Sequence, residues 1–145
     1  MVEINGSRFT LSGDNKPYSL FTLNREYLTQ VAEYVRLISE DGFDPENVRF
    51  EYQGLDLVVL DEKGPKIGIE VKPSAKHGET LRTRILKMLS APNFPVNDKR
   101  NDAAQKIKCL LNLRPREFWI VTQSTSWRFR ATYPAPDQII LTEVE

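Results

Sequence analysis

Residues 54–73 read Gly54-Leu-Asp-Leu-Val-Val-Leu-Asp-Glu-Lys-Gly-Pro-Lys-Ile-Gly-Ile-Glu-Val-Lys-Pro73, and the rest of the expected fold is arranged around them. Two apolar runs, 57–60 and 67–71, flank a polar turn that contains glycine and proline. Short runs rich in β-branched residues, separated by such a turn, predict a β-hairpin. Closing the hairpin symmetrically about Lys63 gives the pairs Leu60–Lys66, Val59–Ile67, Val58–Gly68 and Leu57–Ile69, and then sets Asp56 opposite Glu70.

Asp56 and Glu70 would form a pair of like charges in this hairpin. Directly opposed cross-strand residues have Cβ atoms roughly 4.5–5.5 Å apart, and like charges there destabilise a sheet. A bound divalent cation would relieve the repulsion, and Mg²⁺ is commonly held by one or two carboxylates. Side-chain alternation places Lys72 on the same face as Glu70 and turns Ile69 and Val71 into a core. Two carboxylates beside an ammonium suit phosphodiester hydrolysis.

The arrangement of Asp56, thirteen intervening residues and then Glu70-Val71-Lys72 resembles the PD-(D/E)XK nuclease-like superfamily. The residue before the motif aspartate is Leu55 rather than proline, which is a departure that many members share. The resemblance implies a restriction-endonuclease-like fold and hydrolysis of DNA or RNA with Mg²⁺ or Mn²⁺, with DNA favoured. It implies that Asp56, Glu70 and Lys72 are catalytic, that Asp56 and Glu70 bind the metal, and that the main-chain carbonyl of Val71 is a further ligand.

Two other interpretations remain open. A Glu-X-Lys sequence on a strand is often a solvent-facing ion pair, and an upstream aspartate arises easily by chance. The same fold could therefore serve as a non-catalytic nucleic-acid-binding or protein-interaction module. The chain could also be an unrelated α/β domain in which the motif is accidental.

The composition predicts one globular domain spanning residues 1–145. Hydrophobic residues make up 40% of the chain and charged residues 28%, and no apolar stretch approaches the ~20 residues of a membrane span. We see no signal-peptide pattern at the N-terminus, so the cytoplasm is the expected compartment. With a single cysteine, Cys109, and a single histidine, His77, the chain has no internal disulfide and no zinc cluster.

Charge is unevenly distributed although the net charge is zero. Residues 72–116 contain eleven Lys/Arg against three Asp/Glu, a net of +8, whereas residues 1–71 have a net of −6. Such a basic block favours contacts with nucleic-acid phosphates, although two amphipathic helices with basic exposed faces would give the same count. The candidate nucleic-acid contacts are Lys76, His77, Arg82, Arg84, Lys87, Lys99 and Arg100.

The N-terminal half is expected to begin with a hairpin over 2–11, centred on Asn5-Gly6, and a loop over 13–17. Apolar residues at three- and four-residue spacing predict a helix from about 23 to 40. The resemblance implies a first-helix glutamate in the metal site. We expect Glu33 in that role, and Glu26, two turns earlier on the same face, remains the alternative. Residues 48–52 alternate and predict the first strand of the main sheet.

The C-terminal half is expected to start with a loop over 74–78 and helices over about 79–90 and 98–112, the second capped by Asn97 or Asp98. The apolar run 118–122 predicts a central strand, and 127–133 and 139–144 predict further strands. The predicted class is α/β (α+β), with an α-β-β-β-α-β core, a mixed sheet flanked by helices, a short N-terminal hairpin and extra C-terminal strands. A single active site per small domain would require a homodimer, or two successive events, to cut both strands of a duplex.

Overall fold

A computed structural model describes residues 2–5, 8–11, 17–19, 25–91 and 101–145. Within these ranges the protein is α+β, with a six-stranded mixed sheet and three α-helices. The helices are α1 (Arg25–Ser39), α2 (Ala75–Ser90) and α3 (Asp102–Leu113), with a short 3₁₀ turn, η1 (Pro45–Asn47). The sheet contains β4 (Val48–Tyr52), β5 (Leu55–Asp61), β6 (Gly64–Val71), β7 (Glu117–Val121), β8 (Ser126–Thr132) and β9 (Ile140–Val144).

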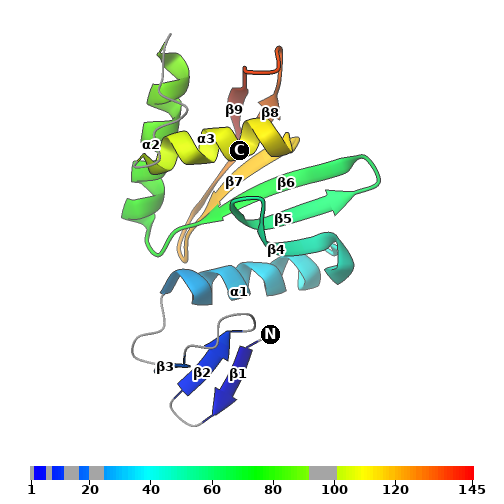
Figure 1. Cartoon of the computed structure of the whole chain (residues 1–145), viewed down its shortest axis with the longest axis vertical. Helices are drawn as coiled ribbons and strands as arrows, with labels where there is room; N and C mark the ends of the chain where they lie inside the picture. The colour runs from blue at the N-terminus through cyan, green and yellow to red at the C-terminus, as the bar shows by residue number, and fades with distance from the viewer. Residues whose placement is uncertain (1, 6–7, 12–16, 20–24, 92–100) are drawn as a thin grey trace.

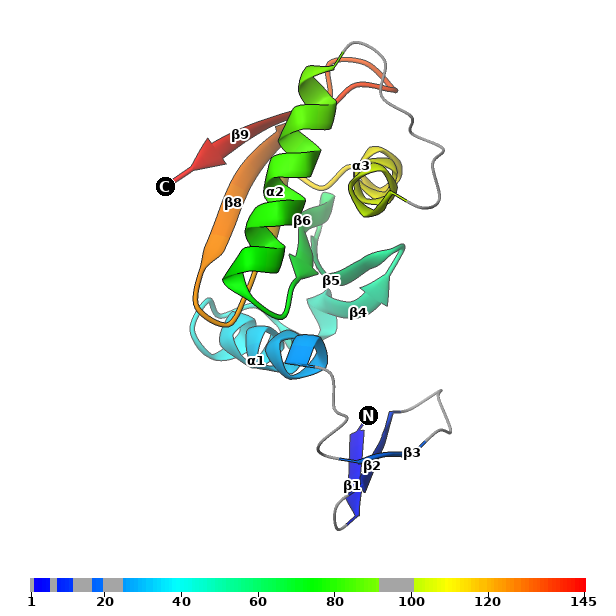
Figure 2. The same ribbon diagram turned by 90° about the vertical axis from the view of Figure 1, so that its left-hand side faces the viewer.

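The sheet is ordered β4-β5-β6-β7-β8-β9, and β6 and β7 form its one parallel pair. Parallel neighbours need a long crossover connection, and here α2 and α3 lie within it. Figures 1 and 2 show α2 and α3 on one face of the sheet and α1 on the other. The predicted mixed sheet flanked by helices is therefore confirmed at the level of fold class.

Two apolar cores follow from the alternation of side chains along the central strands. On one face Val58, Phe118 and Ile120 pack with α2 and α3 residues such as Ile85 and Ile107. On the other face the core consists of Leu37 from α1 together with Val48, Leu57, Val59, Ile67, Ile69, Val71, Trp119 and Val121. Residues 118–121 are all buried, as predicted for a strand covered on both sides.

The β5–β6 hairpin has the predicted register over Leu57–Ile69, Val58–Gly68 and Val59–Ile67. The predicted pairing of Leu60 with Lys66 is wrong, because an irregularity after Val59 shifts Leu60 onto Pro65. Toward the other end the ladder stops at Leu57 and Ile69, so Asp56 and Glu70 are not ladder partners. The two strands therefore leave their regular pairing at the two motif carboxylates.

Helix α2 begins earlier than predicted. Residues 75–78 are expected in a loop, but Ser74 caps the helix by accepting a hydrogen bond from the His77 N–H, and Ala75 is the first helical residue. Gly78 lowers the helix propensity of this segment, but glycine is needed here because neighbouring side chains leave no room for a Cβ atom. A Cβ built there would lie 2.6 Å from the Trp127 ring and 2.7 Å from the Thr122 methyl group. Helix α3 is capped by Asn101, whose side chain accepts a hydrogen bond from the Ala104 N–H, and the predicted caps Asn97 and Asp98 lie outside the described residues.

The N-terminal residues form a separate three-stranded sheet of β1 (Val2–Asn5), β2 (Arg8–Leu11) and β3 (Pro17–Ser19). The predicted hairpin is confirmed, since Asn5 pairs with Arg8 and Val2 with Leu11. Pro17 is expected in a loop but begins β3, a position that proline tolerates. Among the described helices, none has the length and apolar content needed to cross a membrane.

Candidate active site

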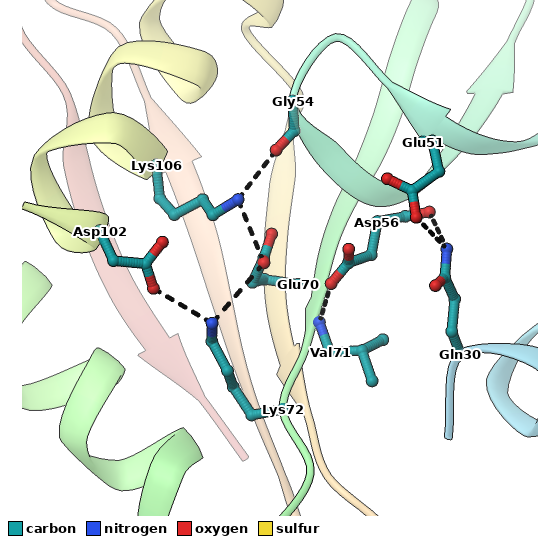
Figure 3. A network of polar contacts seen from close by, with 9 residues as sticks. All are labelled: Gln30, Glu51, Gly54, Asp56, Glu70, Val71, Lys72, Asp102 and Lys106. Atoms are coloured by element: carbon teal, nitrogen blue, oxygen red, sulfur yellow. Dashed lines mark hydrogen bonds and ion pairs between the residues drawn. The ribbon is translucent and has the colours of Figure 1, made fainter. Parts of the chain in front are cut away.

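Glu70 lies at the centre of a partly buried polar network at the end of β6 (Figure 3). It is 2% exposed, and its Oε1 atom lies 3.2 Å from the Lys106 ammonium and 4.0 Å from the Lys72 ammonium. Its other carboxylate oxygen, Oε2, is buried and has no hydrogen-bond partner. Since a buried polar atom without a partner is costly and rare in a folded protein, this oxygen is a candidate ligand for a cation or a hydrogen-bond donor.

Asp56 is held by two hydrogen bonds, one to its side chain and one to its main-chain carbonyl, at the point where β5 and β6 separate. Its Oδ2 atom accepts a hydrogen bond of 2.8 Å from the Val71 N–H. Its main-chain carbonyl accepts one of 2.8 Å from the side-chain amide of Gln30, which is buried on α1 and also reaches Glu51. These bonds take over where the regular β5–β6 ladder ends, and they fix the Asp56 carboxylate beside β6.

The third carboxylate of the site is Glu26, in the first turn of α1. Glu26, Asp56 and Glu70 each offer one oxygen, and these three atoms lie within 4.8 Å of one another. Three converging carboxylates can hold a hard divalent cation, although the arrangement does not identify which ion.

The expectation that Glu33 completes this cluster is not met. Glu33 is buried elsewhere and accepts two hydrogen bonds from Arg36, at 2.6 and 2.9 Å. Glu26 and Glu33 do share a helix face, but seven residues separate them by about 10 Å along the axis. The N-terminal end of α1 approaches the carboxylates, so only the earlier glutamate reaches them.

Two lysines flank the carboxylates from different elements. Lys72 lies 3.1 Å from Asp102, the first residue of α3, while Lys106, one turn later, also donates to the Gly54 carbonyl at 2.9 Å. The sequence indicated Lys106 only as part of the basic block. The i, i+4 spacing of Asp102 and Lys106 predicts that they share one face of a helix. It does not predict that this face lies beside the end of β6.

Burial and neighbouring charges shift the pKa values of Glu26, Glu70 and the two lysines. Burial, followed by repulsion from Asp56, holds the pKa of Glu70 well above its ordinary value despite the two lysines. The pKa of Glu26 is raised by the same two causes. Burial opposes the charge on Lys72 and Lys106, but attraction to Asp102 and Glu70 outweighs it, and the pKa of each lysine is raised. Negative charge on Glu26 and Glu70 is therefore unfavourable, and a bound cation would relieve it.

The candidate nucleic-acid contacts lie mainly on α2. Lys76 and His77 are exposed in its first turn, and Arg84 and Lys87 are exposed further along. Arg82 is less available than expected, because it pairs with Glu79 and with Glu143 of β9. Lys99 and Arg100 lie outside the described residues.

No family model, no curated protein and no solved structure matches this chain.

Proposed function

We propose that this protein is a Mg²⁺- or Mn²⁺-dependent nuclease with a restriction-endonuclease-like fold that hydrolyses phosphodiester bonds of DNA or RNA. The observation that carries the proposal is the buried Glu70 carboxylate, whose Oε2 atom lacks a partner within a cluster that also contains Asp56 and Glu26. A cluster of acids alone would be weak support. The unsatisfied buried oxygen is a second, independent indication of a ligand.

Glu26, Asp56 and Glu70 would hold the cation, and the Val71 carbonyl is a further candidate ligand. A divalent cation in such a site lowers the pKa of water and offsets charge on a phosphate. Lys72, 4.0 Å from Glu70, would donate to the phosphate oxygens or orient the attacking water. Lys106, 3.2 Å from Glu70, would keep that carboxylate in place.

The order of elements also supports the proposal. Helix α1, strands β4, β5 and β6, helix α2 and strand β7 follow one another in the α-β-β-β-α-β order of the resembled superfamily, with α3 added before β7. The parallel pairing of β6 with β7 places the motif strand in the interior of the sheet.

A non-catalytic role is the second candidate, and one contact favours it. Lys106 partly compensates Glu70 without any metal, so the network could be a structural ion cluster in a binding module. Buried ion pairs of this kind need not be catalytic.

A cleavage assay with matched variants of the same hairpin separates the two candidates. Supercoiled plasmid and labelled oligonucleotides of DNA and RNA would be incubated with Mg²⁺ or Mn²⁺. We expect wild-type cleavage to be abolished by Glu70→Gln and Lys72→Met. Glu62→Gln and Lys63→Met make the same chemical changes in the exposed turn at the far end of the hairpin and should leave cleavage intact. Equal cleavage by the wild type and all four variants would show that this site does not catalyse the reaction.

Thermal unfolding tests metal binding without requiring a substrate. A ligand that binds only the native state raises Tm, so Mg²⁺ or Mn²⁺ should stabilise the wild type. Asp56→Asn should gain much less, while its metal-free Tm stays equal or rises because one of the repelling charges is removed. If neither ion changes the Tm of the wild type and Asp56→Asn lowers the metal-free Tm, the cluster has a structural role and does not bind metal.

A further inference from the structure

A cavity of about 880 Å³ lies between α1 and the segment that links β7 to β8. Its volume falls in the range of roughly 300–1,000 Å³ that is typical of ligand sites. The α1 side includes Leu28, Thr29 and Arg36, and the opposite side is formed by residues 121–126 and by Arg128. None of these residues belongs to the carboxylate cluster, so the cavity needs an explanation of its own.

Arg128 is the distinctive charge in this cavity. Its guanidinium carbon lies 4.0 Å from the centre of the Trp119 ring, which holds the side chain against the sheet. Within the described part of the chain, no carboxylate lies within ion-pair distance of Arg128. The other two charged residues that line the cavity, Arg36 and Glu33, pair with each other, and Arg36 also pairs with Asp41. A half-buried guanidinium without a counter-ion is suited to a phosphate.

The 122–125 turn, which forms the cavity wall opposite α1, is held in one conformation by hydrogen bonds within it. The Thr122 N–H and hydroxyl both donate to the Thr125 carbonyl at 2.8 Å, and the Thr125 N–H donates back to the Thr122 hydroxyl at 3.1 Å. The tight turn between them exposes the polar side chains of Gln123 and Ser124 beside the cavity. A wall held in this way loses little conformational entropy when a ligand binds.

The cavity and the carboxylate cluster lie at the same end of the sheet. The main-chain N–H of Lys72 donates to the Val121 carbonyl at 2.9 Å, so the ends of β6 and β7 are side by side. Thr29 of the cavity is one helical turn from Glu26 of the cluster. The cavity lies on the α1 face of the sheet, whereas Glu70 and Lys72 lie on the α3 face. A nucleic-acid strand that contacts both would therefore pass around the end of β6 and β7.

We propose that this cavity binds an unpaired nucleotide next to the cleaved phosphodiester, with Arg128 donating to its phosphate. This inference rests on the proposed nuclease function and narrows its substrate to nucleic acid that is single-stranded near the cleaved bond. A base still paired in a duplex would bring its complementary strand against α1 or the 122–125 turn. Enzymes that enclose a base accordingly act on unpaired or extruded nucleotides.

The test is the affinity of the full chain for a fluorescently labelled single-stranded 12-mer, measured by anisotropy in EDTA at several salt concentrations. Arg128→Gln is compared with Arg130→Gln, which makes the same change two residues along the same face of β8. Arg130 is exposed, lies opposite Glu117 and is outside the cavity. We expect Arg128→Gln to weaken binding about tenfold or more and to lower the salt slope by about one. Arg130→Gln should change both quantities little, and Arg128→Lys should restore part of the affinity.

Annealing the 12-mer to its complement should reduce the effect of Arg128→Gln. The proposal is overturned if the wild type does not bind the single strand, if the two Gln variants lose affinity equally, or if the loss is as large on the duplex. Unfolding curves in EDTA show whether each variant is folded, since Arg128→Gln also removes the contact with Trp119. If binding depends on Arg128 but no cleavage is seen, only the nuclease proposal is contradicted. If the protein cleaves but its binding does not depend on Arg128, only the cavity proposal is contradicted.

Discussion

At the scale of single residues, Glu70 makes the stability of the metal-free protein depend on pH. Its pKa is raised in the folded state, mainly by burial and then by Asp56. A carboxyl group with a raised pKa binds its proton more tightly in the folded than in the unfolded chain. Its contribution to stability is therefore complete below the ordinary carboxyl pKa and is lost as pH rises through the raised value.

We therefore expect Glu70→Gln to gain stability relative to wild type as pH rises from 5 to 8 in EDTA. Urea unfolding at each pH measures this difference. The matched variant Glu62→Gln replaces an exposed glutamate and should follow the wild-type curve. Parallel curves for Glu70→Gln and wild type would mean that Glu70 is fully compensated by Lys106 and Lys72 and has no need of a cation.

At the scale of elements, the close approach of α2 to the β7–β8 turn depends on Gly78. Alanine normally stabilises a helix interior relative to glycine by up to about 1 kcal/mol. Here the new Cβ would lie 2.6 Å from the Trp127 ring and 2.7 Å from the Thr122 methyl group, and Thr122 is itself locked in the turn. Overpacking typically costs about 1–3 kcal/mol, so the steric cost should exceed the gain in helix propensity.

We expect Gly78→Ala to lower the free energy of unfolding by about 1–2 kcal/mol, measured with urea. Lys76→Ala changes an exposed residue in the same part of α2 and should stay within about 0.5 kcal/mol of wild type. A stabilised Gly78→Ala protein would show that the contact between α2 and the turn can relax at little cost.

At the scale of the whole molecule, the net charge of zero conceals a basic block in residues 72–116 and an acidic N-terminal half. The structure divides the arginines and lysines of α2 into two groups. Arg82 ties α2 to β9 through Glu143, whereas Arg84 and Lys87 are exposed. Only the exposed group is free to add long-range attraction for phosphates without a structural role.

We expect Arg84→Glu combined with Lys87→Glu to weaken nucleic-acid binding and to reduce its dependence on salt, while leaving Tm near the wild-type value. Arg82→Glu should instead lower Tm, because it places a third negative charge beside Glu79 and Glu143. Anisotropy titrations and thermal unfolding measure the two effects separately. Unchanged affinity in the double variant would make this face an ordinary solvated surface.

The features that depend on local periodicity, namely strand faces, hairpin register and buried strands, could be predicted from the amino-acid sequence. Alternation along residues 67–72 was enough to place Glu70 and Lys72 on the face opposite Ile69 and Val71, and the structure has that arrangement. The register of three hairpin pairs followed from the turn between the two apolar runs. The apolar run at 118–121 was sufficient to predict a strand buried on both faces.

Which distant residues meet at the carboxylates depends on how the helices pack on the sheet. Glu26 and Glu33 share a helix face, so the choice between them depends on which end of α1 crosses the end of the sheet. Lys106 reaches Glu70 because α3 packs on the face of the sheet to which Glu70 points. Arg128 borders a cavity that is lined by α1 on one side and by the 122–125 turn on the other. Periodicity specifies the face of a helix or strand on which a side chain lies. The packing of the helices on the sheet determines which side chains of other elements it contacts.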